Sequence, residues 1–334
     1  MNYLVTLSLP VYNVEPYIEK ALLSALNQSF ESIEYIIVDD KGSDNSMDIV
    51  RSVIATHPRK KDVRIIEHHQ NIGLGAGRNT AIENATGKYI YFMDSDDEIC
   101  NNCIEILYSK MQKKPADFIA GSIINKDRKE NIITQFVHDD ISISGRSTIA
   151  LDYYKRKRRI VTVWNKLYDL DFLLKNNIKC IPSHLNEDNI FTFQVVLNAL
   201  SCMYISDLTY TYYDTPESIL KAVSSNKISA RYAKQYVECV NFKKEYIKKY
   251  NDVKVREAVF RYIIFQTIYY LVQIDKSTVL TKQEKKQYLK ELLVLPFNIS
   301  EITHFKKKLF FYCVYVIYSL PFTKTCFKII YRIF

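Results

Sequence analysis

Three aspartates stand within four positions directly after one of the apolar runs of the chain. Asp94, Asp96 and Asp97 follow the run 88–93, which has the composition of a buried strand. Carboxylates this close together repel one another unless a cation lies among them. Such oxygen ligands suit Mg²⁺ or Mn²⁺, which complete their coordination with phosphate oxygens. The alternative is a solvated turn with helix-capping aspartates, but the position at a strand end favours a metal site.

Polar residues also follow the three earlier apolar runs. In an open parallel sheet the ligand lies beyond the carboxyl ends of the strands, so each end is a candidate ligand contact. The runs 4–9, 33–38 and 63–67 are followed by Pro10 and Tyr12, by Asp39 and Asp40, and by a glycine-rich stretch that ends at Arg78. This coincidence of polar strand ends predicts a ligand site along one edge of the sheet.

Two of these strand ends have more than one interpretation. Asp39 and Asp40 could accept a hydrogen bond from a pyrimidine N–H or a ribose hydroxyl, or could form a capping turn before the next helix. The glycine-rich stretch 73–77 only loosely resembles a dinucleotide-binding fingerprint, because it follows the third strand and lacks the full spacing. We therefore expect it to allow close backbone approach, with Arg78 able to meet a base or phosphate.

Alternating strands and helices are predicted to position these residues. Apolar runs at 4–9, 33–38, 63–67, 88–93 and 117–122 alternate with amphipathic stretches at 16–27, 46–57, 74–85 and 103–112. This order predicts an α/β domain with a mostly parallel sheet and helices on both faces. The segments from about 130 to 220 are short and mixed, and helical patterns dominate from about 226 onward.

Four stretches of the chain carry a family resemblance. SLPVYNVEPYIEKALLSALNQSF with the following IIVDDKGSDNS, then NIGLGAGRNTAIENATGKYIYFMDSDDE, VWNKLY and NEDNIF resemble the family 2 glycosyltransferases of the Rossmann-like GT-A fold. The resemblance covers about residues 3–220, and the four motifs occur in the family's order. The chain departs from the family at Lys41-Gly42, where Gly-Ser is usual, and this affects the local turn.

The resemblance implies an inverting sugar transfer from a nucleotide-diphosphate donor, usually a UDP-sugar. It also implies that Mn²⁺ or Mg²⁺ bridges the diphosphate. The implied nucleoside contacts are Pro10, Tyr12, Glu15, Asp40 and Arg78, to which the strand-end residue Asp39 is added. Asp94 would contact the ribose, and Asp96 and Asp97 would hold the metal ion.

The last two motifs supply the remaining candidates. Inverting displacement needs a carboxylate that takes the acceptor's proton. The resemblance assigns this base to Asp188, with Glu187 beside it, although the pair could also be an ordinary acidic helix start. Trp164 could stack on a sugar face or pack in the core, and Lys166 could balance phosphate charge.

The C-terminal part is strongly basic. Residues 221–334 contain 22 Lys and Arg against 8 Asp and Glu, a net charge of +14, whereas the whole chain carries +9. We expect this part to meet an anionic membrane surface, although a solvated helical surface is the alternative. The run 258–274 is expected to be a core helix, not a membrane span. Residues 305–334, with an apolar core at 309–322, are expected to lie in the membrane interface or dock on the protein.

Smaller features complete the expectations. No charged region precedes the first apolar run, so no signal peptide and a cytoplasmic location are expected. Cys100 and Cys103 have redox-motif spacing but are expected to be unpaired thiols. His68 and His69 are expected at an exposed strand end. No nucleic-acid-binding module is recognisable, so nucleic acid is not an expected partner.

The sequence therefore predicts two parts with different tasks. Residues 1–220 would form a GT-A catalytic domain, and residues 221–334 a basic helical region that associates with the inner face of a membrane. The acceptor would be a hydroxyl of a glycan or lipid-linked glycan in cell-surface polysaccharide synthesis. A catalytically silent nucleotide-sugar-binding module is the alternative. A sugar-nucleotide pyrophosphorylase is disfavoured because no glycine-rich loop follows the first strand.

Overall fold

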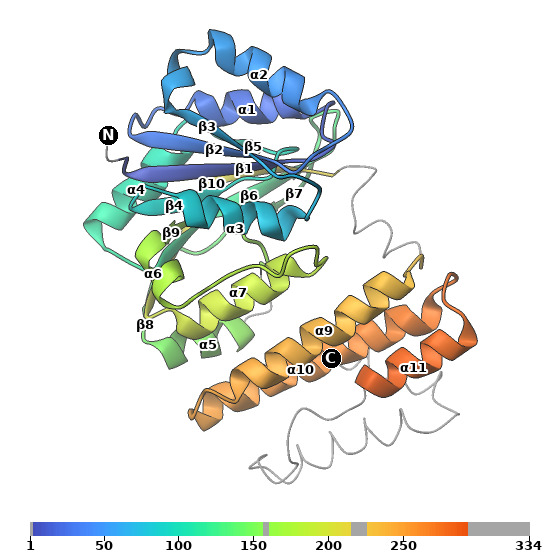
Figure 1. Ribbon diagram of the computed structural model, residues 1–334. Coiled ribbons are helices and arrows are strands. Elements are labelled where there is room, and N and C mark those ends of the chain that lie inside the picture. The colour runs from blue at the N-terminus through green and yellow to red at the C-terminus, as the bar shows by residue number, and fades with distance from the viewer. Residues whose placement is uncertain (1–2, 156–159, 215–225, 293–334) are drawn as a thin grey trace. The chain divides into compact units, whose positions relative to one another are not determined.

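The computed structural model describes residues 3–155, 160–214 and 226–292. The chain divides into two compact units, Met1–Ser218 and Ile219–Phe334. The first unit is an α/β domain and the second is helical in its described part (Figure 1). The expected C-terminal interfacial segment, 305–334, lies outside the described residues.

A ten-stranded sheet forms the centre of the first unit, with the strand order β3-β2-β1-β4-β9-β6-β10-β5. Strand β7 pairs with β6, and β8 pairs with β10. The strands are β1 (Val5–Val11), β2 (Ile33–Asp39), β3 (Val63–Glu67), β4 (Tyr89–Phe92), β5 (Glu98–Ile99), β6 (Phe118–Lys126), β7 (Ile132–Phe136), β8 (Ile141–Ser144), β9 (Lys166–Asp169) and β10 (Ser201–Tyr213).

The first half of the sheet, β3-β2-β1-β4, is parallel throughout. Val11 pairs with Asp39, and Asp39 pairs with Glu67, so the carboxyl ends of these strands meet at one edge as predicted. Strand β1 continues through Pro10, which pairs with β2. On its other side β4 pairs with β1 only as far as Ser8, so the missing N–H of Pro10 interrupts no pairing there.

The second half joins the first through a strand that the sequence pattern did not reveal. Strand β9 lies antiparallel between β4 and β6, so β6 does not continue the parallel series directly. Strands β6 and β10 are parallel to each other. The insertion brings Trp164 and Asn165, which precede β9, next to the end of β4. The α/β class and the GT-A arrangement are confirmed, with antiparallel pairs added in this half.

Helices cover both faces of the sheet, as predicted (Figure 1). Side chains of α1 (Ile18–Leu26), α2 (Ser46–Thr56) and α4 (Cys103–Lys113) pack in one core with alternate residues of β1 and β2. Helix α3 (Leu74–Asn84) packs on β1 and β2, and Phe191 of α7 (Glu187–Asn198) contacts Phe92 and Tyr168. The remaining elements are the 3₁₀ helix η1 (Pro58–Asp62), α5 (Arg146–Lys155) and α6 (Leu170–Lys175).

The cysteines and the second unit agree with the expectations that the structure tests. Cys100 and Cys103 are free thiols at the start of α4. The second unit contains α9 (Ala230–Ile247), α10 (Val253–Lys276) and α11 (Lys282–Leu292), with stacked Tyr236 and Tyr270 between α9 and α10. The run 258–274 lies within α10, whose apolar side is buried. Within residues 3–155, 160–214 and 226–292, none of the helices has both the length and the apolar character needed to cross a bilayer.

Candidate active site

A buried arginine joins acidic residues from two separate parts of the chain, the end of β4 and the start of α7. Arg78 of α3 is fully buried. Its Nη2 donates to Asp94 Oδ1 at 2.8 Å, and its Nη1 donates to Asp188 Oδ1 at 2.5 Å and Glu187 Oε1 at 3.3 Å. We call these four residues the Arg78 cluster. The structure thus brings the predicted catalytic base Asp188 and its neighbour Glu187 together with Asp94, which is far from them in the sequence.

Two glycines of α3 make this convergence possible. A Cβ on Gly77 would lie 3.2 Å from the Pro10 side chain, and a Cβ on Gly75 would lie 2.8 Å from the carbonyl oxygen of Ile181. Helix α3 can therefore approach both β1 and the segment before α7. Asn79 fixes that segment, because its side chain bonds both the N–H and the carbonyl of Cys180. The glycine-rich stretch thus allows close backbone approach to β1 and to the segment before α7, while its predicted approach to a ligand stays a prediction.

Burial gives the carboxyl groups of the Arg78 cluster different proton affinities. Burial raises the pKa of Glu187 to about 8, and the neighbouring charge of Asp188 adds to the shift while Arg78 opposes it. Burial raises the pKa of Asp94 to about 6, again against the effect of Arg78. Glu187 is therefore mainly protonated at neutral pH. Asp188 is the more exposed member of the pair, with 26% of its side chain accessible, whereas Glu187 has 11%.

The two aspartates predicted to bind metal lie in different surroundings. Asp97 is buried, and its carboxylate accepts hydrogen bonds from the Tyr210 hydroxyl at 2.8 Å and from the Tyr213 N–H at 2.9 Å. The Asp96 side chain is 32% exposed, and its nearest ionic partner is Arg128 at 3.9 Å. Burial raises the pKa of Asp96, and the charge of Arg128 opposes this. Asp97 therefore braces β10 against the strand end, while Asp96 keeps an accessible carboxylate.

The acidic edge fits a divalent ion that takes only part of its coordination from protein. Across the described residues, no three His, Cys, Asp or Glu side chains converge closely enough to enclose a metal ion. Asp96 offers an open carboxylate and Asp94 lies two positions before it, so one or two protein oxygens are available. Mg²⁺ and Mn²⁺ fit such a donor set, since they commonly complete their coordination with phosphate and water.

On the nucleoside side, Asp40 organises the loop before α3. Its two buried carboxylate oxygens accept hydrogen bonds from the N–H groups of Ile72 and Gly73 at 2.9 and 2.8 Å, and from the Asn71 side chain. Gly73 has a φ of +90°, a conformation that disfavours residues with a Cβ. The Asp40 carboxylate is therefore engaged with its own chain, and the loop that it holds borders the predicted ligand edge.

His68 does not lie where the sequence suggested. The expectation of an exposed strand end is wrong for this residue, because only 9% of its side chain is exposed. Its ring bonds Asp40 Oδ1 at 2.7 Å and the Thr80 hydroxyl at 2.8 Å. The residue links Asp40 to α3. The sequence did hold a signal for this position, because His68 directly follows β3. The rule that polar residues after parallel strands lie at the ligand edge had identified the other strand-end residues.

The other predicted nucleoside residues surround the ends of β1 and β2. Tyr12 is exposed, whereas Pro10 is buried under α3. Glu15 accepts hydrogen bonds from the main chain and side chain of Asn45 at 3.0 and 3.1 Å. Asp39 accepts the N–H of Lys41 at 2.8 Å, and Lys41 has a φ of +56°. The departure from Gly-Ser thus places a lysine in the left-handed region at this turn.

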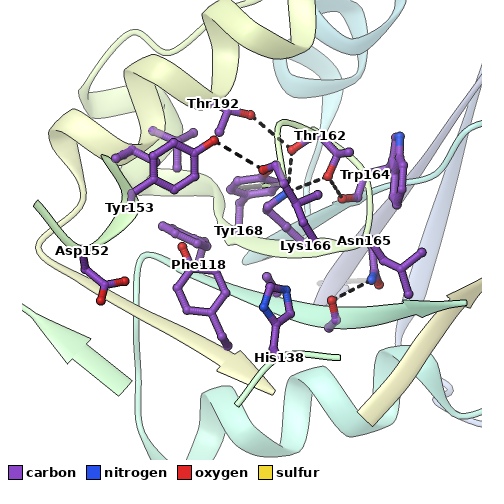
Figure 2. A pocket seen from close by; sticks show the side chains of 17 residues that line it. Phe118, His138, Asp152, Tyr153, Thr162, Trp164, Asn165, Lys166, Tyr168 and Thr192 are labelled. Atoms are coloured by element: carbon purple, nitrogen blue, oxygen red, sulfur yellow. Dashed lines mark hydrogen bonds between the residues drawn. The ribbon is translucent and has the colours of Figure 1, made fainter. Parts of the chain in front are cut away.

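Trp164 and Lys166 line a pocket beside α7 (Figure 2). Trp164 stacks on Tyr210 at a centroid distance of 4.3 Å, so the core-packing interpretation of this residue is correct. It also borders the pocket. Lys166 Nζ donates to the Thr162 hydroxyl at 2.8 Å, and burial lowers the pKa of Lys166 to about 7 against the effect of Asp188. Thr192, four residues after Asp188 on α7, lines the same pocket and also bonds Thr162.

Two residues at the site were missed by the sequence reasoning. Asn165 lies between Trp164 and Lys166 with a φ of +56°, and its side chain bonds the carbonyls of Gly121 and Ser122. Its position inside a recognised motif was a usable signal. Arg128 lies in the turn between β6 and β7, 3.9 Å from Asp96. No spacing in the sequence relates this residue to Asp96, because a hairpin brings it there.

The sheet order, the acidic edge and the paired carboxylates on α7 define a GT-A domain arranged for a nucleotide ligand. The family model for glycosyl transferase family 2 matches residues 6–173. The chain belongs to this family and is a glycosyltransferase.

Relatives and solved structures agree with this assignment. The glycosyltransferase YibD of Escherichia coli K12 is 26% identical over 249 residues, which is 73% of this chain and 71% of that protein. The structure of Staphylococcus aureus TarS 1–349 in complex with UDP-GlcNAc matches with a TM-score of 0.68 and 21% identity, covering 89% of this chain and 82% of the TarS 1–349 chain. A mannosyltransferase of Pyrobaculum calidifontis in complex with GDP-Man and Mn²⁺ matches with a TM-score of 0.52 and 13% identity, covering 97% and 83%.

Proposed function

We propose that the protein transfers a hexosyl or N-acetylhexosaminyl group with inversion from a UDP-sugar to a hydroxyl of a glycan or lipid-linked glycan. The observation that carries the proposal is the Arg78 cluster. It holds a partly exposed carboxylate, Asp188, at the edge where the acidic strand end lies. The TarS complex with UDP-GlcNAc, which shares the fold, supports a uridine donor.

Asp188 is the proposed base. Its carboxylate takes the proton of the acceptor hydroxyl as the acceptor oxygen bonds to the anomeric carbon, and the bond from that carbon to the diphosphate oxygen breaks. Arg78 orients Asp188 through the 2.5 Å hydrogen bond, and Glu187, with its raised pKa, adds no second negative charge at neutral pH. The nucleoside diphosphate leaves on the side opposite to the attack, which gives inversion.

Asp96 is the proposed protein ligand of Mn²⁺ or Mg²⁺, with Asp94 beside it. The ion would neutralise the charge of the diphosphate leaving group. Asp97 supports the acidic edge through Tyr210 and Tyr213, which refines the expectation that Asp97 itself binds metal. The mannosyltransferase complex with Mn²⁺ is consistent with this choice of ion.

The nucleoside is proposed to lie over the loops at the ends of β1 and β2. Tyr12 offers an exposed ring for stacking, with Pro10 and Glu15 nearby in sequence. Asp39 and Asp40 shape the adjoining turns through the hydrogen bonds described above. Arg78 is proposed to act by positioning Asp94 and not by direct contact with the nucleobase, because its side chain is fully buried and Nη1 and Nη2 already face carboxylates.

The acceptor is proposed to approach the exposed side of Asp188, because the neighbouring pocket of Figure 2, with a volume of about 30 Å³, has room for little more than water. Trp164 is only 8% exposed and stacks on Tyr210, so it would support this side of the site from the core. Lys166, with its lowered pKa, could exchange a hydrogen bond with an acceptor hydroxyl or phosphate. The net charge of +14 on residues 221–334 supports a membrane-bound acceptor at the cytoplasmic face, in cell-surface polysaccharide synthesis.

The first test is nucleotide-sugar hydrolysis without acceptor. UDP-, GDP- and dTDP-sugars would be incubated with Mn²⁺ and either the wild-type protein or the Asp96→Ala variant. Slow release of one nucleoside diphosphate, lost in the variant, is expected. Asp171→Ala is the matched control, because Asp171 is an exposed aspartate paired with Lys175 outside the site. Binding without turnover of any donor, even with glycan acceptors, would favour the silent module, and no binding would overturn the proposal.

A further inference from the structure

The turn between β6 and β7 carries a guanidinium to the acidic edge. Asp127 shapes this turn by accepting the N–H groups of Lys129 and Asn131 at 2.8 and 2.9 Å. The next residue, Arg128, places Nη2 3.9 Å from Asp96 Oδ2. This distance allows charge attraction but is too long for a hydrogen bond. The turn therefore brings a cation to the most accessible of the three aspartates.

Two aromatic rings hold the Arg128 guanidinium by its faces. Its Cζ lies 3.9 Å from the ring centroid of Tyr17 and 4.7 Å from that of Tyr213. Such contacts attract the cation to the ring faces, but the N–H groups lie in the guanidinium plane and need oxygen acceptors. Among the described residues, Nε and Nη2 of Arg128 are buried and have no hydrogen-bond partner. In-plane donors are thus held ready for an acceptor that the described protein does not supply.

The Arg128 side chain lines a cavity of about 200 Å³. Its lining includes Tyr17, Asp96, Arg128 and Glu130. Glu130 is already paired with Lys126 at 3.0 Å and accepts from Tyr213. The cavity is several times larger than the roughly 30 Å³ that one water occupies in the liquid, so it has room for an oxyanion group.

We propose that Arg128 is an exchangeable counter-ion of Asp96 and a ligand of the donor diphosphate. In the donor-free protein the guanidinium balances the Asp96 charge. With the nucleotide diphosphate and its divalent ion bound, Asp96 would serve as a ligand of the ion, and Arg128 would donate its in-plane N–H groups to the β-phosphate of the nucleoside diphosphate leaving group. The inference rests on the proposed function and adds a residue and an order of events to it.

The exchange has a thermodynamic consequence. Arg128 and a divalent cation repel each other at Asp96, so the metal ion alone binds weakly. The diphosphate carries negative charge to both cations, so nucleotide and metal bind cooperatively. Because Arg128 repels the divalent ion but attracts the diphosphate, its removal should raise the affinity for the ion alone and lower the affinity for the nucleotide. Loss of a purely structural arginine would lower both.

The test measures the two affinities separately on the full chain. Mn²⁺ binding without nucleotide would be followed by electron paramagnetic resonance of the free ion, and UDP binding at saturating Mn²⁺ by calorimetry. For Arg128→Gln, Mn²⁺ alone is expected to bind several-fold more tightly, and UDP about tenfold more weakly, a loss typical of one charge-assisted hydrogen-bonding partner. A melting curve would establish that the variant is folded.

Two variants separate this role from general charge effects. Lys20→Gln removes a positive charge from the lining of the same cavity, but Lys20 pairs with Glu130, so both affinities should stay within about twofold. Arg128→Lys keeps the positive charge but lacks the planar set of N–H donors. The affinity for Mn²⁺ alone should therefore stay low, while the affinity for UDP falls. If the Mn²⁺ and UDP affinities of Arg128→Gln changed in the same direction, this inference would be overturned and the proposed function would stand. Absence of UDP binding in the wild type would instead overturn the proposed function.

Discussion

Arg78 and Arg128 each bring a guanidinium to the aspartates that follow β4, one from helix α3 and the other from the turn between β6 and β7. Arg78 is fully buried and has three carboxylate partners within 3.3 Å. The Arg128 side chain is 28% exposed and lies 3.9 Å from one carboxylate. Among the described residues its Nε and Nη2 both lack a hydrogen-bond partner, whereas in Arg78 only Nε does. The first arrangement suits a permanent scaffold, and the second suits a contact that changes when a ligand binds.

The largest effect should come from breaking the scaffold. Arg78→Met leaves Asp94, Glu187 and Asp188 buried without their cation, and removal of one partner from a buried ion pair typically costs about 3–5 kcal/mol. We expect a loss of unfolding free energy of this size in urea titrations. Arg51→Gln is the control, since Arg51 pairs with Glu67 at the surface and should matter by about 1 kcal/mol or less. Equal losses of unfolding free energy in the two variants would show that the buried ion pairs of Arg78 contribute no more to stability than a surface pair.

The next effect concerns chemistry on the scaffold. Asp188→Asn keeps the size of the side chain but removes the proton acceptor, so kcat for sugar transfer should fall by about 10²–10⁴. UDP affinity with Mn²⁺ should change little, because Asp188 is proposed to act on the acceptor. The control variant is Asp171→Asn, the same substitution at an exposed aspartate outside the site. A variant that loses UDP binding and turnover together would place Asp188 in donor binding instead.

A smaller and pH-dependent effect is expected at Glu187. Its folded pKa of about 8 lies above the ordinary value near 4.5, so the folded state binds more protons between these values. Stability then falls as pH rises from about 4.5 to 8, by at most about 1.4 kcal/mol per pH unit. Glu187→Gln should remove this slope, so its advantage over the wild type should grow with pH in urea titrations. A constant difference from pH 5 to 9 would contradict the raised pKa.

The smallest effect should come from the exposed cation at the end of β2. Lys41 pairs with Glu67 at 2.9 Å and with Asp39 at 3.6 Å, and it occupies the left-handed region that glycine prefers. Lys41→Gly removes surface ion pairs of small value and relieves the backbone, so the melting temperature should move by about 2 °C or less. A larger drop, measured by calorimetry, would mean that this turn is as tightly coupled as the Arg78 cluster.

Much of the first unit could be predicted from the sequence because its information is local. Apolar runs gave the parallel strands β1 to β4 within one or two residues, and the switch-point rule located their polar ends. The placement of β9 was out of reach, since four residues carry no distinctive period. The partners of Arg78 and Arg128 were hidden for a related reason. Arg78 and Asp188 are 110 residues apart, and Arg128 reaches Asp96 only through the β6–β7 hairpin. Neither contact corresponds to a recognisable spacing in the sequence.

The position of β9 also has a consequence for synthesis of the chain. Strand β4 is complete by residue 92, but its outer neighbour is not made until residues 166–169 leave the ribosome. For more than seventy residues of elongation, the nascent sheet presents an open edge beside the future catalytic strand. Open edges invite pairing with other chains, so this interval is the period in which misassembly is most costly. The four residues of β9 pair with both β4 and β6, and so end the exposure of the β4 edge.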